Sequence, residues 1–113
     1  MKSEPDNFAE DIRRKYLLAE YYLAVERPVQ ALIALKTVHL DTLSRGERKD
    51  FLLRIATCYQ RLHNHEAAHG VFLRIMADHP DEGDIETMAR LNYEEYLRDL
   101  SGGSSTLEKT TSL

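Results

Sequence analysis

Residues 52–80 read LLRIATCYQRLHNHEAAHGVFLRIMADHP, and this stretch decides the fold. Apolar residues recur in it every three or four positions, which is the spacing of an amphipathic helix. Asn64 interrupts the pattern and is a favoured helix cap, so one helix is predicted up to about Leu62 and another after Asn64. The second helix is predicted to stop before the His79-Pro80 pair, because proline disfavours a helical backbone in the residue before it. The stretch therefore predicts a helical hairpin and an all-α fold.

The same stretch carries small, aliphatic and aromatic residues at fixed spacing. They are Leu52, Ile55, Ala56, Tyr59, Ala68, Phe72 and Pro80. The tetratricopeptide repeat has the pattern W-x2-L-G-x2-Y…A-x3-F…P, so segment 49–82 resembles one such repeat, with Leu in the Trp position and Ala in the Gly position. A weaker copy lies upstream, offset by 37 residues (Leu18 to Ile55). Its matching residues are Leu18, Ala19, Tyr22, Ala31 and Leu35. It departs from the repeat at Lys15 and Leu43, which replace the aromatic residue and the proline.

The resemblance implies about two tetratricopeptide-like helical hairpins plus a C-terminal capping helix, arranged as a right-handed α-solenoid. Pro28 is expected to start a helix, and Ser44 with Glu47 is expected to form a capping box. From these caps and breakers we expect helices over about 8–26, 28–43, 44–62, 64–78 and 83–100. Residues 8–100 form the expected helical domain, and residues 1–7 are expected to be disordered. Residues 101–113 begin with a Gly/Ser run, which predicts a flexible linker followed by a peptide tail.

Composition excludes several classes of protein. The chain has 113 residues, which is one domain by length, and its net charge of −4 provides no general attraction to nucleic acid. It has no apolar run approaching the ~18 residues of a spanning helix. Residues 1–7 are too polar and acidic for a signal peptide. Cys58 is the single cysteine, which excludes an internal disulfide and favours a reducing, cytoplasmic location.

One motif suggests chemistry. Residues 65–69 read HEAAH, and two His at this spacing on a helix can hold zinc with the Glu as base. However, Ala68 belongs to the repeat pattern, and no convincing third ligand follows. His63 with His65 and His69 also suggests a metal, but side chains solvated around a turn are the favoured interpretation. We therefore expect no catalytic residue, no metal and no cofactor, with a metal-dependent hydrolase as a remote alternative.

The resemblance also implies a concave groove lined by the first helix of each hairpin. Helical spacing places eleven residues on this face. They are Arg13, Tyr16, Leu17, Glu20, Leu23, Asp50, Leu53, Arg54, Thr57, Gln60 and Arg61. An ordinary solvated helix surface is the alternative interpretation. Family members that clamp a terminal carboxylate use a Lys and an Asn where this chain has Tyr16 and Glu20, so that mode of binding is not indicated.

The expected function is that of an adaptor or scaffold, which binds an extended or helical segment of a partner protein in the groove. A small secretion-type or assembly chaperone that shields an apolar partner segment is the alternative. The tail Thr106–Leu113 is itself a candidate ligand, in its own groove or in that of a neighbouring molecule, with Leu107, Glu108 and Leu113 making the contacts. A monomer or weak dimer is expected.

Overall fold

The computed structural model describes the backbone of residues 3–112 and the side chains of residues 10–101. This part of the chain is all-α and contains no strand, as predicted. Its elements are α1 (Ser3–Ala24), α2 (Pro28–Lys36), the short 3₁₀ helix η1 (Leu40–Thr42), α3 (Arg45–Arg61), α4 (His65–Asp78) and α5 (Gly83–Ser112). Among the described residues, no helix combines the length and apolar composition needed to cross a membrane.

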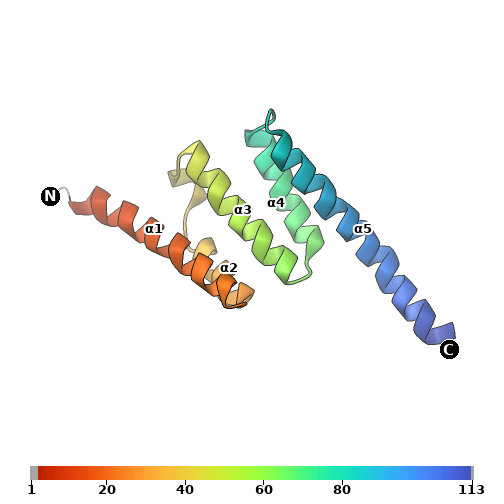
Figure 1. Cartoon of the computed structure of the whole chain (residues 1–113). Helices are drawn as coiled ribbons and strands as arrows, with labels where there is room; N and C mark the ends of the chain where they lie inside the picture. Colours follow the sequence, from red (N-terminus) through yellow and green to blue (C-terminus); the bar gives the residue numbers. More distant parts are fainter. Residues whose placement is uncertain (1–2, 113) are drawn as a thin grey trace.

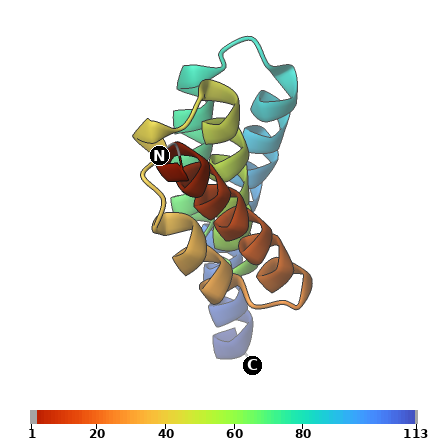
Figure 2. The same ribbon diagram turned by 90° about the vertical axis from the view of Figure 1, so that its left-hand side faces the viewer.

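α1, α3, α4 and α5 follow one another in a row, and the short α2 lies behind the end of α1 (Figure 1). Each helix packs against the next, and α1 also contacts α3. Seen from its α1 end, the row recedes from α1 through α3 to α4 and α5 (Figure 2). The radius of gyration is 17.0 Å, against about 13 Å for a compact domain of this length. Contacts are thus mostly between neighbours, and the outermost helices keep faces that no other helix covers.

The turns after α1 and α3 have the same geometry. Glu26 and His63 both have a positive φ, of 62° and 60°, and they are 37 residues apart. In each turn the following residue donates its N–H to a carbonyl five residues back: Arg27 to Tyr22 at 2.7 Å and Asn64 to Tyr59 at 2.8 Å. This is the Schellman arrangement, which satisfies the last carbonyls of a helix. The chain therefore turns in the same way at equivalent positions of its two copies.

Two predicted helix caps are confirmed. Ser44 accepts a hydrogen bond from the N–H of Glu47, and the Glu47 carboxylate accepts one from the N–H of Ser44, which completes a capping box at the start of α3. Asn64 accepts from the N–H of Ala67 and caps α4. These side chains satisfy backbone donors that have no partner within the helix.

The helix predicted over residues 28–43 is wrong in its second half. α2 ends at Lys36 because Thr37 and Val38 close it with short-range bonds to the carbonyls of Ala34 and Leu35. The chain then forms η1 and becomes extended at Leu43. Val38 and Leu43 both become buried. A continued helix would place Val38 and Leu43 on different faces. Because the chain leaves the helix, both side chains reach the core.

The outer helix ends also differ from the prediction. α1 begins at Ser3 instead of Phe8, and α5 continues past Gly102 and Gly103 to Ser112 instead of ending near Leu100. Glycine costs a helix about 1 kcal/mol relative to alanine, which weakens it without breaking it as proline does. The flexibility expected of residues 1–7 and 101–113 stays a prediction. The tail side chains Leu107, Glu108 and Leu113 lie outside the described side chains.

The core contains eight of the residues that carry the sequence pattern. The buried members of the two copies are Ala19, Ala31, Leu35, Leu52, Ile55, Ala56, Ala68 and Phe72. Other members of the pattern lie outside the buried core: Leu18 is exposed on α1, where no preceding helix covers it, Pro80 is exposed, and Tyr22 and Tyr59 are partly buried. Cys58 is buried, and burial raises the pKa of its thiol to about 11. This thiol is therefore protonated at neutral pH and is no candidate nucleophile.

Ala68→Leu is expected to lower the free energy of unfolding by about 1–3 kcal/mol, because it overpacks a closely packed core. Ala68 is completely buried in α4, the helix between α3 and α5. Chemical denaturation measures the change. Ala77→Leu is the matched control, since Ala77 is exposed on the same helix, and it should change stability by less than about 0.5 kcal/mol. Equal stability of the two variants would contradict the close packing at Ala68.

Candidate binding groove

Two hollows lie along the line where α1 meets α3. The first has a volume of about 400 Å³ and is named the apolar hollow. Its lining residues are Ile12, Arg13, Tyr16, Thr42, Leu43, Glu47, Asp50 and Phe51. The second, of about 330 Å³, is named the arginine hollow. Its lining residues are Glu20, Leu23, Ala24, Arg54, Thr57 and Arg61. Together they form a candidate groove along the two helices.

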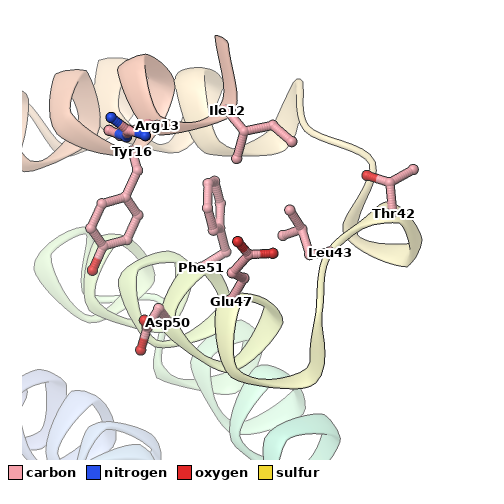
Figure 3. A pocket seen from close by; sticks show the side chains of 8 residues that line it. All are labelled: Ile12, Arg13, Tyr16, Thr42, Leu43, Glu47, Asp50 and Phe51. Carbon is pink, nitrogen blue, oxygen red and sulfur yellow. The ribbon is translucent and has the colours of Figure 1, made fainter. Parts of the chain in front are cut away.

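The apolar hollow has a hydrophobic floor and a charged rim. Ile12 points from α1 toward Leu43 and Phe51, with Glu47 beside them on α3 (Figure 3). Leu43 and Phe51 are buried, and the ring of Tyr16 packs 5.2 Å from that of Phe51. One side of the hollow is closed by η1 and the extended backbone at Leu43. This side exists because α2 ends early.

Arg54 connects the two hollows and is engaged within the chain. Its Nε donates to the Glu20 carboxylate at 2.9 Å, and Nη2 donates to the same oxygen. The guanidinium also lies 5.5 Å from the centre of the Tyr16 ring, a cation–π contact. Burial is the main reason that the pKa of Tyr16 is raised, so its hydroxyl stays protonated. Arg54 thus ties α1 to α3, and its charge is already neutralised by Glu20.

Arg61 differs from Arg54 in its exposure. It is exposed at the edge of the arginine hollow, where Nη1 donates to the backbone carbonyl of Leu23 at 3.2 Å. A guanidinium carries five N–H donors, so this single bond leaves others directed to solvent or to a ligand. Arg61, like the exposed Arg13 of the apolar hollow, is therefore able to meet a partner carboxylate.

The structure brings together most of the residues predicted for the groove. Those in the two hollows are Arg13, Tyr16, Glu20, Leu23, Asp50, Arg54, Thr57 and Arg61. Three others lie elsewhere. Leu17 is exposed outside both hollows, Leu53 packs against the core, and Gln60 donates to Asn92 of α5 at 3.1 Å.

Sequence reasoning missed five residues of the apolar hollow: Ile12, Thr42, Leu43, Glu47 and Phe51. One signal was present for Ile12, which precedes Tyr16 by four residues and so shares its helix face. Leu43 could not be found in this way, because its position depends on η1, which the sequence pattern did not indicate.

The HEAAH segment does not assemble as a zincin site. His65 and His69 contact different residues of α5: the His65 Nδ1 lies 3.2 Å from Asn92 Oδ1, whereas the His69 ring packs 4.8 Å from that of Tyr93. Glu66 is exposed. Within residues 10–101, the carboxylates whose oxygens lie within 4.8 Å of a His65 ring nitrogen and of each other are Glu95 and Asp99 of α5, and the group includes neither Glu66 nor His69.

Comparisons with protein-family models, with curated proteins and with solved structures found no match to this chain. The tetratricopeptide resemblance therefore depends on the spacing of the chain's own residues. Function has to be inferred from the hollows and the helices that form them.

Proposed function

We propose that this chain is a tetratricopeptide-like adaptor that holds an extended or helical segment of a partner protein along α1 and α3. The repeated turn supports the repeat assignment: Glu26 and His63 are offset by 37 residues, the same offset that separates the two sequence copies. The proposal includes the right-handed solenoid arrangement and involves no catalytic step.

The apolar hollow is the observation that carries the proposal. Binding sites for small groups are typically concave and mostly apolar, with a few polar groups at the edge. Here Ile12, Leu43 and Phe51 offer apolar surface, and the carboxylates of Glu47 and Asp50 stand beside it. A large apolar side chain of the partner would fill this space and exclude water, as the anchor residues of protein interfaces do.

The charges along the groove indicate which charged residues the partner segment should carry beside its apolar anchor. In the apolar hollow the two carboxylates of Glu47 and Asp50 outnumber the one cation, Arg13, and so favour a basic residue next to the apolar anchor. Arg61 favours an acidic residue farther along. Asp50 and Arg61 are eleven positions apart on α3, which corresponds to about 16 Å of helix. An extended peptide covers that distance in about five residues. The partner segment therefore combines an apolar anchor and a basic residue with an acidic residue about five positions away.

Ile12→Lys is expected to weaken peptide binding at least tenfold, or about 1.4 kcal/mol, because it places a charge in the apolar hollow. Peptides would be selected from a displayed random library on the full chain, then titrated by fluorescence anisotropy. Arg61→Glu should weaken binding of the acidic peptides, and this effect should shrink at high salt. The control is Ile33→Lys, on an α2 side chain that is 60% exposed and outside both hollows.

Two results would contradict the proposal. A selected peptide that binds Ile12→Lys and the parent equally does not occupy the apolar hollow. A library that yields no saturable ligand on a correctly folded chain removes the adaptor proposal. Circular dichroism of each variant separates lost binding from lost structure.

The chaperone alternative is favoured by a different surface. The outer sides of α1 and α2 expose large apolar residues, among them Leu18, Tyr21, Val29 and Ile33. Apolar faces of this kind are common at sites where another protein binds. The same variants separate the two functions, because a chaperone that uses this face would be impaired by Ile33→Lys and unaffected by Ile12→Lys.

The tail is less suited to the chain's own groove than to that of a neighbour. α5 continues to Ser112 and carries its end away from α1 and α3 (Figure 1). To reach the apolar hollow of its own molecule, the last part of α5 would have to unfold and reverse. Binding of Thr106–Leu113 to a neighbouring molecule needs no such change and remains part of the prediction.

A further inference from the structure

His65 is held against α5 beside two carboxylates. It is the first residue of α4, and its side chain is 10% exposed. Its ring nitrogen Nε2 lies 3.5 Å from Asp99 Oδ2. One ligand atom each from His65, Glu95 and Asp99 lie within 4.8 Å of one another. Glu95 and Asp99 are four residues apart on α5, so their side chains project from the same helix face.

A buried amide determines which nitrogen of His65 carries the proton. Asn92 is 1% exposed, and its Nδ2 donates to the backbone carbonyl of His65 at 3.0 Å. That bond fixes Asn92 Oδ1 as the acceptor for the Gln60 amide at 3.1 Å and for His65 Nδ1 at 3.2 Å. Because Asn92 Oδ1 is an acceptor, His65 Nδ1 must carry a proton to bond to it. The neutral ring then has its lone pair on Nε2, which faces the carboxylates.

Metal-binding histidines have this arrangement of ring hydrogen bonds. Such residues usually donate their second ring N–H to an oxygen acceptor, which fixes the tautomer and the ring orientation. The Nε2–Oδ2 separation of 3.5 Å is close to the edge of about 3.3 Å in a tetrahedron with metal–ligand bonds of about 2.0–2.1 Å. It is long for a hydrogen bond, whose N···O distance is usually about 2.7–3.2 Å.

We propose that His65 Nε2 and the carboxylates of Glu95 and Asp99 bind a divalent first-row transition metal ion, of which Zn²⁺ is the representative. One imidazole with two carboxylates suits these ions, whereas Mg²⁺ and Ca²⁺ prefer sites made of oxygen alone. The ion would join α5 to the start of α4, and water would complete its coordination. This departs from the sequence-based expectation of no metal, because the ligands come from two helices about 30 residues apart in sequence.

The competing explanation is a simple ion pair between protonated His65 and Asp99. The Asp99 side chain is half-exposed, and exposed ion pairs contribute little to stability. Arg98 also lies 3.3 Å from the Glu95 carboxylate, and an ion would have to compete with it. The two explanations differ in their response to zinc, since an ion pair alone gains nothing from it.

The test uses the full chain, dialysed against a chelator and then titrated with ZnCl₂ by calorimetry and by thermal melting. We expect saturable binding of one ion per chain and a rise in Tm, since a ligand of the folded state stabilises it. Glu95→Gln and Asp99→Asn should each abolish the saturable phase or weaken it more than tenfold. Both side chains are exposed, so these variants should fold normally. Glu94→Gln and His69→Gln are matched controls that should bind zinc as the parent does.

Asn92 acts as a positioning residue, and Asn92→Ala should weaken zinc binding by about 10–100-fold. Nitrogen NMR of the His65 ring provides an independent measurement: the zinc-free parent should show the proton on Nδ1, and zinc should shift the Nε2 signal. Equal zinc affinity in the parent, Glu95→Gln and Asp99→Asn would indicate an adventitious ion only, and would overturn the proposal. Absence of any saturable binding would also overturn it.

Discussion

Phe72→Ala is expected to lower the free energy of unfolding by about 3–5 kcal/mol. Phe72 is 1% exposed and is among the largest fully buried side chains of α4. Its removal costs both the transfer of its ring from water and the cavity that remains. A domain of this size has a total stability of about 5–15 kcal/mol, so the loss is a large part of the whole. Because α4 packs between α3 and α5, we expect the entire row to weaken, not α4 alone.

Urea denaturation followed by circular dichroism measures this effect. Leu73→Ala is the matched control, since Leu73 is the next residue and is 51% exposed. It should change stability by less than about 0.5 kcal/mol. If the two variants were equally stable, Phe72 would not be at the centre of the core, and the packing of α3 on α4 would be wrong.

The sequence predicted well those features that depend on a few neighbouring residues. The capping box of Ser44 and Glu47, the cap at Asn64 and the proline start of α2 each follow from chemistry within one helical turn. Burial of Ala68 and Phe72 followed from spacing along one helix. In each case the structure satisfies the same backbone or apolar groups that the local sequence identifies.

The sequence did not predict features that depend on distant partners. α2 ends at Lys36 so that Val38 and Leu43 reach the core, and that requirement arises from α3. Arg54 had the helix position of a groove residue, but its pairing with Glu20 depends on how α1 crosses α3. Thr42 and Leu43 of the apolar hollow were missed for the same reason, since they enter it only through η1 and the extended backbone after it.

Asn92 is the clearest case of a residue whose role depends on distant partners. Its replacement is the second change that we expect to lower the free energy of unfolding strongly. Asn92→Leu preserves the size of the side chain but removes its bonds to Gln60 and to the ring and carbonyl of His65. Each buried polar group left without a partner costs about 1–3 kcal/mol. The His65 carbonyl keeps its acceptor position in the α4 ladder, so the group left without a partner is the ring Nδ1 of His65, whose side chain is nine-tenths buried, and we expect a loss of about 1–3 kcal/mol.

The loss of stability should be largest in α5, which Asn92 joins to the other helices. α5 is attached to the row mainly through α4, and the Asn92 bonds join it to the end of α3 and the start of α4. Hydrogen exchange should therefore accelerate in residues 89–99 of α5 before it does in α3. Leu91→Ala, an exposed neighbour, is the control and should leave exchange unchanged. A double-mutant cycle with Gln60→Leu isolates the amide–amide bond. If Asn92→Leu were as stable as the parent and protected α5 equally, the network would contribute nothing, and apolar packing alone would hold α5 in place.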